Sequence, residues 1–281
     1  MRDYCGVVQS YSQRKLTYAS DKLPAFSGIS SQLQSVIGGT YLAGLWSTHL
    51  IVGLLWQREM ATCAHVLPYR APSWSWAVTD ESIVYYDQEI KYKHASAIKL
   101  LSHQVTPKIA EAPYGEVTFA SITVSGLVMR FVRSEQSVKG YLGDEYYYGL
   151  ASLDENPARL DVRDVEGELP AFIRTSPALF ILSDGNGPYI LAINHSHGPK
   201  LELNIDFGLV TDETYLAVMV YIDEEANGHR EAKSAKGLIV KPVGEQDASG
   251  ELLYERVGVF DFRDFEMAWV SEWKWKTLVL V

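Results

Sequence analysis

Cysteine is scarce in this chain, whose 281 residues contain only Cys5 and Cys63. No signal-like apolar segment precedes them, so the sequence does not support the disulfide framework of a small secreted domain. The residues that follow Met1, Arg-Asp-Tyr-Cys, also lack the basic, Ser-rich character of a transit peptide. We therefore expect a reducing compartment, most simply the cytoplasm.

Long apolar runs and clusters of basic residues are also lacking. The longest apolar run, Tyr41 to Trp56, is interrupted by Ser47, Thr48 and His49 and is shorter than the roughly 20 residues that cross a bilayer. The net charge is −10 and the Lys and Arg residues are scattered, whereas nucleic-acid binding depends on clustered positive charge. Neither a membrane span nor a nucleic-acid partner is expected.

Motifs for covalent, metal or cofactor chemistry are missing as well. The sequence has no Gly-x-Ser-x-Gly, no phosphate-binding loop and no dinucleotide fingerprint, so we expect no cofactor and assign no catalytic residue. His195 and His197 have a spacing that suits a metal, but no third ligand can be identified, and the adjacent Gly198-Pro199 favours a solvated turn. We expect no metal site.

What is present indicates one large domain over residues 1–281, with a helical part (1–70) followed by a β-rich part (71–281). Hydrophobic residues make up 47% of the chain and charged residues 21%, as in ordinary globular proteins. Apolar residues at helical spacing predict a short helix through Ile37, ended by Gly38-Gly39, and then one buried helix over residues 40–57.

From about residue 71 the apolar period changes to two, which predicts strands, the first with Trp74 and Trp76 on one face. The further expected strands, rich in Val, Ile, Tyr or Phe, lie near 84–93, 117–133, 178–183, 189–194, 200–206, 215–222, 235–242, 253–261 and 275–281. The fold class predicted is therefore α+β, with N-terminal helices packed on a mainly antiparallel β-sandwich or open barrel.

Aromatic residues supply the candidate site. Large buried rings usually fill a core, but indole N–H groups around an apolar cavity would also form a ligand pocket, and the sequence leaves both open. We expect such a pocket where the helices meet the first strands, with His49 as either a core residue or a base. The candidate substrate-binding residues are Trp46, His49, Trp56, Trp74, Trp76, Tyr85 and Tyr146.

Several phrases carry a family resemblance: Tyr11-Ser-Gln-Arg14, Tyr41-Leu-Ala-Gly-Leu-Trp46, Ala71-Pro-Ser-Trp-Ser-Trp76 and Tyr254-Glu-Arg256-Val-Gly258. In this order they resemble the region that follows the effector domain of fungal heterokaryon-incompatibility (HET) proteins. The resemblance covers nearly the whole chain and is weakest between residues 80 and 235. The HET domain itself would precede Met1, so we expect a free-standing segment without the effector.

Two functions remain as hypotheses. One is a cofactor-free cyclase of fungal secondary metabolism, a pericyclase of the Diels–Alder type that preorganises an apolar small-molecule substrate in the aromatic pocket; orientation alone can lower a barrier by as much as about 7–11 kcal/mol. The other is a non-enzymatic ligand- or protein-recognition module derived from a HET protein. The sequence sets neither the substrate nor the oligomeric state.

Overall fold

The computed structural model describes residues 2–58, 69–85, 95–133, 138–141, 148–153, 180–182, 190–192, 202–205, 214–223, 234–247, 250–263 and 273–281. Its helices are α1 (Arg2–Ser12), η1 (Ala19–Asp21), α2 (Lys22–Ile37), η2 (Ser47–His49), α3 (Leu50–Leu54) and η3 (Trp76–Val78). Among the described residues, none of these helices combines the length and the apolar character that crossing a bilayer demands.

Strands make up most of the remaining described residues. They are β1 (Tyr41–Leu42), β2 (Leu45–Trp46), β3 (Gln57–Arg58), β4 (Ile83–Val84), β5 (Ala95–Ser96), β6 (Ile98–Pro107), β7 (Val117–Arg133), β8 (Val138–Tyr141), β9 (Tyr148–Leu153), β10 (Phe180–Leu182), β11 (Ile190–Ala192), β12 (Glu202–Ile205), β13 (Thr214–Asp223), β14 (Ser234–Gln246), β15 (Leu252–Arg263) and β16 (Lys274–Leu280). The α+β class expected from the sequence is confirmed.

Ten strands form one large sheet with the order β16-β7-β10-β11-β9-β15-β14-β13-β5, and β6 pairs with β7. All its pairings are antiparallel except β11 with β9 and β15 with β16. Because β7 also pairs with β13, the path of paired strands returns on itself. The sheet is therefore a closed, barrel-like ring of strands and not a sandwich of two layers.

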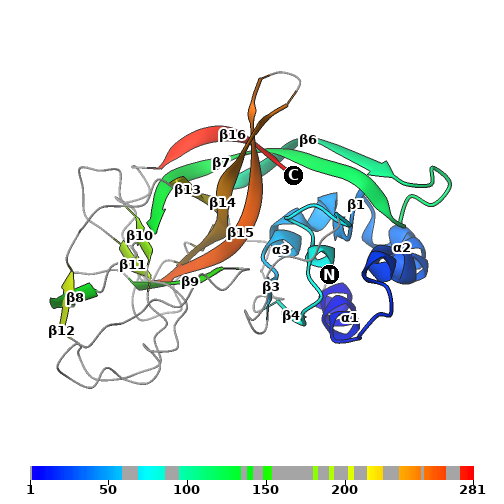
Figure 1. Ribbon diagram of the computed structural model, residues 1–281, viewed down its shortest axis with the longest axis horizontal. Coiled ribbons are helices and arrows are strands. Elements are labelled where there is room, and N and C mark those ends of the chain that lie inside the picture. Colours follow the sequence, from blue (N-terminus) through cyan, green and yellow to red (C-terminus); the bar gives the residue numbers. More distant parts are fainter. Residues whose placement is uncertain are drawn as a thin grey trace.

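The helices gather at one end of the molecule, where the long strands β6 and β7 arch over them (Figure 1). A single hydrophobic core joins the two parts, since it runs from Tyr4 and Phe26 in the helices to Val124 and Leu278 in the sheet. At the outer end of the arch, the Tyr114 hydroxyl donates to Oε1 of Gln34 in α2, at 3.1 Å.

The helix expected over residues 40–57 is wrong. This segment is a β-hairpin, β1 paired with β2, followed by the short helices η2 and α3. The turn of the hairpin is Ala43-Gly44, and both residues have positive φ (42° and 100°), as tight hairpin turns of this hand require. A segment that is apolar on all sides has no clear period, so its periodicity does not separate a buried helix from a buried hairpin.

The strand expected at Trp74 and Trp76 is also wrong, because this segment is a series of turns leading into η3. Ser75 is as fully buried as the two indoles, so the side chains do not alternate between two faces. Its hydroxyl donates to the carbonyl of Ala43 at 2.5 Å and accepts from the N–H of Ala77 at 3.1 Å. The serine thus ties the turn to the hairpin and caps η3.

Candidate functional site

The structure brings most of the predicted site residues together near the junction of helices and sheet. Trp46 ends the β1–β2 hairpin, Trp56 directly precedes β3, Trp74 and Trp76 flank Ser75, and Tyr85 directly follows β4. His49 lies apart at the end of η2, and its half-buried ring has Nδ1 3.0 Å from the hydroxyl of Thr48. Tyr146, His195 and His197 lie outside the described residues.

The four indoles are core side chains. Trp46, Trp56, Trp74 and Trp76 each have 0% of their surface exposed. A ring with no exposed surface touches no cavity large enough for a water molecule. In this structure the four rings fill the interior, and their expected role as pocket walls stays a prediction.

Hydrogen bonds of the indoles to the protein backbone fix their positions. Trp56 Nε1 donates to the carbonyl of Trp74 (3.0 Å), and Trp74 Nε1 donates to that of Leu280 (3.2 Å). Trp76 Nε1 donates to the carbonyl of Gly44 (2.7 Å). Three of the donors that a ligand would need are thus already used inside the protein.

The first two helices dock on this aromatic core. Tyr4 of α1 donates from its hydroxyl to the same carbonyl of Gly44, at 2.7 Å, and its ring packs edge-on against Trp46. Phe26 of α2 contacts Trp76 edge-on, with ring centroids 5.2 Å apart. Edge-to-face pairs of this kind contribute about 0.5–1.5 kcal/mol each beyond the area they bury.

Burial also governs the titration of Tyr85 and His49. Tyr85 is 4% exposed, and desolvation raises the pKa of its hydroxyl well above the ordinary value. Desolvation lowers the pKa of the half-buried His49 imidazole below its ordinary value. Within the described ranges, no three His, Cys, Asp or Glu side chains lie close enough together to hold a metal ion.

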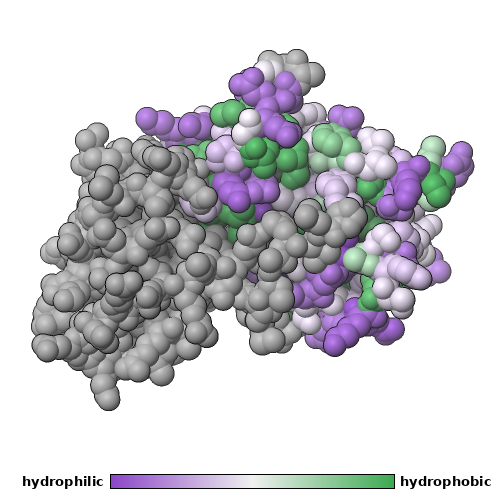
Figure 2. All heavy atoms as spheres, in the orientation of Figure 1, coloured by the Kyte–Doolittle hydropathy of each residue, from purple (hydrophilic) through white to green (hydrophobic). Residues whose placement is uncertain are grey.

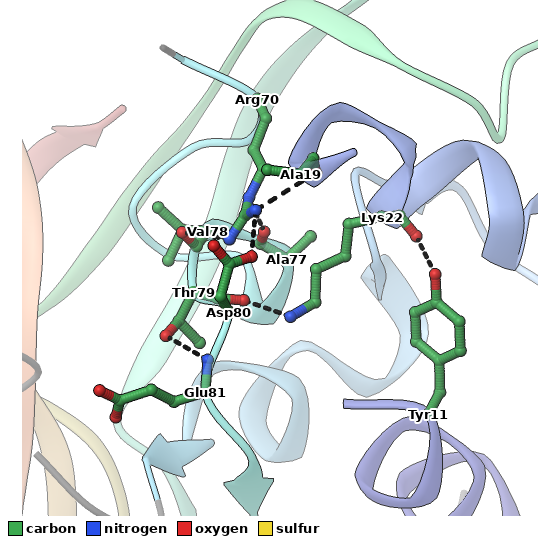
Figure 3. Close-up of polar contacts among 9 residues, drawn as sticks. All are labelled: Tyr11, Ala19, Lys22, Arg70, Ala77, Val78, Thr79, Asp80 and Glu81. Atoms are coloured by element: carbon green, nitrogen blue, oxygen red, sulfur yellow. Dashed lines mark hydrogen bonds and ion pairs between the residues drawn. The ribbon is translucent and has the colours of Figure 1, made fainter. Parts of the chain in front are cut away.

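A buried polar cluster that sequence reasoning missed lies beside this core, around Arg70 (Figure 3). The Arg70 guanidinium donates to the carbonyl of Ala77 through Nε (2.7 Å) and to that of Val78 through Nη2 (2.9 Å). Its Nη1 donates to the carbonyl of Ala19 (3.2 Å) and to a carboxylate oxygen of Asp80. Arg70 therefore joins η1 to the carboxyl end of η3, whose last carbonyls lack partners within the helix.

Lys22 completes the cluster by donating from Nζ to the carbonyl of Thr79. Burial, and secondarily the nearby charge of Arg70, lower the pKa of the Lys22 amine to about 8. An amine with this pKa is partly neutral, and hence nucleophilic, near pH 8. Lys22 is only 3% exposed, however, so the cluster is closed to a substrate and acts as a structural clamp.

An open surface feature is the groove between α1 and α2, with a volume of about 760 Å³. Its walls are Asp3, Gly6, Val7, Ser10, Tyr11 and Arg14 from the α1 segment and Ala25 and Ile29 from α2. In the space-filling view, hydrophilic residues predominate at this end of the molecule, with small hydrophobic areas among them (Figure 2). This groove differs in place and in lining from the pocket expected at the Trp cluster.

The α1 face that lines the groove lies opposite the face that enters the core. Cys5, Val8 and Ser12 point inward and are buried, whereas Val7 has 37% of its surface exposed. Ile29 of α2, on the far wall, is 38% exposed. The sequence pattern that would predict this surface is weak, because the surface consists of small residues and a few apolar ones at helical spacing.

No family model, curated protein or solved structure matches this chain.

Proposed function

We propose that this chain is a non-enzymatic protein-recognition module that binds a helical segment of its partner in the groove between α1 and α2. The observation that carries this proposal is Gly6: a Cβ added there would meet no atom within 4 Å. Glycine inside a helix costs about 1 kcal/mol relative to alanine. Gly6 thus weakens α1 without relieving any contact inside the protein, and the close approach of a partner's backbone would account for it.

The remaining groove residues suit a helical partner. Val7 and Ile29 offer exposed apolar surface on the two walls, and Ser10 and Ala25 are small enough for a second helix to approach closely. Asp3 lies near one end of the groove and Arg14 near the other, and neither has an ion-pair partner among the described residues. A helix laid in a groove of this kind is one of the recurring modes of peptide recognition.

Recognition is better supported than catalysis. A cyclase of the kind considered from the sequence needs an apolar cavity that its substrate can enter, whereas the indoles proposed to line it are inaccessible. A surface groove needs no such cavity. Recognition also agrees with one role expected from the resemblance to the region that follows the effector domain of HET proteins.

The test uses a displayed library of amphipathic helical peptides selected on the whole chain, with affinities measured by fluorescence anisotropy. We expect selected peptides to lose at least ~10-fold in affinity, about 1.4 kcal/mol, for Gly6→Leu. Gly28→Leu is the matched control, because Gly28 lies in α2, also has open space around its Cβ position, and is not a wall of the groove. Peptides that bind Gly6→Leu as tightly as the unmodified chain would refute the proposal.

A further inference from the structure

The pattern of side chains along α1 indicates which helix occupies the groove. This inference rests on the proposed function. We infer that the helix that occupies the groove is α1 of a second copy of this chain, lying antiparallel to the first about a two-fold axis. The chain would then form a symmetric dimer in which each α1 lies in the groove of the other copy.

Charge supports this arrangement. Asp3 lies in the first turn of α1 and Arg14 lies two residues past its last residue, Ser12, so the midpoint between the two charges falls between Val8 and Gln9. In an antiparallel pair centred on this midpoint, Asp3 of each copy lies opposite Arg14 of the other copy. The 11 residues of α1 span about 16 Å, and Arg14 lines the groove just beyond the helix, so the two contacts form at opposite ends of the groove. A two-fold interface requires this self-complementarity.

Side-chain size follows the same symmetry. Gly6, with open space at its Cβ position, lies opposite Tyr11 of the second copy. The Tyr11 ring packs on Phe26 and Trp76 of its own chain, so only its half-exposed edge in the groove faces Gly6. The exposed Val7 lies opposite the small Ser10. All six residues of the α1 segment that line the groove are therefore paired by one symmetry operation, large with small and acidic with basic.

The contribution of α2 completes the interface. Each incoming helix also contacts Ala25 and Ile29 on the far wall, so the four helices form a bundle in which each α1 touches the α1 and the α2 of the other copy. Isolated ion pairs at a surface contribute little. The apolar contacts of the exposed Val7 and Ile29 therefore supply most of the affinity, while Asp3 and Arg14 fix the antiparallel direction.

The test exchanges charges and measures the dimer dissociation constant of the whole chain by sedimentation equilibrium. Asp3→Arg alone would place two arginines together at each end of the groove, and Arg14→Asp alone would place two aspartates together. Each single variant should weaken dimerisation by at least ~10-fold. An equimolar mixture of the two single variants should form a heterodimer with an affinity near that of the unmodified chain, as should the double variant Asp3→Arg/Arg14→Asp.

Lys15→Asp is the matched control, because it makes the same change in net charge as Arg14→Asp at the exposed neighbouring position, outside the groove. It should leave the dissociation constant unchanged. Thermal unfolding of every variant verifies that the fold is kept. An unmodified chain that stays monomeric, single variants that dimerise normally, or a mixture that fails to recover would each overturn the inference.

The two proposals fail in different ways. If selected helical peptides bind the chain and lose affinity for Gly6→Leu while charge exchange does not restore dimerisation, the groove recognises a different protein and only the dimer is refuted. If Gly6→Leu changes neither peptide binding nor dimerisation, the groove has no role, and the proposed function is refuted together with the dimer.

Discussion

The ammonium group of Lys22 donates a hydrogen bond to the backbone carbonyl of Thr79, a residue 57 positions further along the chain. This bond joins the first turn of α2 to the residue that follows η3. Together with the three backbone contacts of Arg70, it holds the two short helical turns η1 and η3 in place. A buried charge is costly, so this connection has a measurable dependence on pH.

Stability should rise with pH in the range where Lys22 loses its proton. Its pKa is lowered from 10.5 to about 8 in the folded chain. Between these values the unfolded chain binds more protons than the folded chain, so the destabilisation is complete below pH 8 and is relieved as pH rises. We expect the free energy of unfolding, measured with urea, to increase by about 2 kcal/mol from about pH 7.5 to about pH 9.5.

Lys22→Met is the control for this rise, because it removes the titrating group and keeps an unbranched side chain of similar length. Its free energy of unfolding should stay nearly constant over the same range. Measurements should stop at the upper end of that range, because the buried hydroxyls of Tyr4, Tyr41 and Tyr85 have raised pKa values and oppose folding at higher pH. The prediction would be contradicted if the free energy of unfolding rose equally with pH in Lys22→Met and in the unmodified chain.

A second prediction compares two indoles that are equally buried but differently bonded. Trp76 Nε1 donates to the carbonyl of Gly44, whereas Nε1 of Trp46 has no hydrogen-bond partner within the described part of the chain. Replacement by Phe removes ring volume at both positions but removes a hydrogen bond only at position 76. Trp76→Phe should therefore lower the free energy of unfolding by about 1 kcal/mol more than Trp46→Phe does.

Both variants should be less stable than the unmodified chain. Thermal unfolding measures the loss of stability, and peptide binding measured in parallel gives any change in affinity. The ring partners of Trp46 do not line the groove, so Trp46→Phe should leave the affinity for a groove-binding peptide unchanged in the folded fraction. Trp76 packs edge-on against Tyr11 of the groove wall, so only the stability of Trp76→Phe enters the comparison. Trp46→Phe with full stability and lost affinity would instead return the aromatic cluster to the role of a binding pocket.

The third prediction concerns Gly237 in β14. A Cβ added there would lie 2.1 Å from the carbonyl oxygen of Val218 in β13 and 2.5 Å from the ring of Phe260 in β15. Since one of these neighbours is backbone, the strands must separate to accommodate a methyl group. Gly237→Ala should lower the free energy of unfolding by about 1–3 kcal/mol or more, by overpacking.

Gly28→Ala is the matched control for the same change of side chain. Gly28 lies in α2 with open space at its Cβ position, so alanine there should raise the free energy of unfolding by up to about 1 kcal/mol through helix propensity. Urea denaturation of both variants measures the difference. Equal stability of the two alanine variants would show that β14 is not packed as described.

Sequence reasoning predicted the helix that ends at Gly38 and the strands now seen as β7 and β10 to β16. These segments share strong local signals: a glycine just past a helical pattern, and runs of β-branched or aromatic residues between turns. β6 was missed because its pattern is polar: several consecutive side chains, including Ser102, His103 and Gln104, are exposed. An exposed edge strand has no buried face to produce alternation.

The candidate site was less predictable, because it depends on contacts between distant residues. The four indoles were expected near one junction, and they are found there, but only the three-dimensional packing decides between core and cavity. Lys22 and Arg70 are 48 positions apart in the sequence, so nothing local indicates that both bind carbonyls at the end of η3. The groove, likewise, exists only once α1 and α2 are packed together.

The contacts of residues 280 and 281 bear on when this molecule acquires its core during synthesis. The carbonyl of Leu280 accepts the indole N–H of Trp74, 206 positions earlier, and that of Val281 accepts from Ser73, 208 positions earlier. A ribosome adds about 5–20 residues each second. For roughly ten seconds or more at that rate, Trp74 would wait as an exposed aromatic side chain on a nascent chain, at risk of aggregation unless a chaperone covers it.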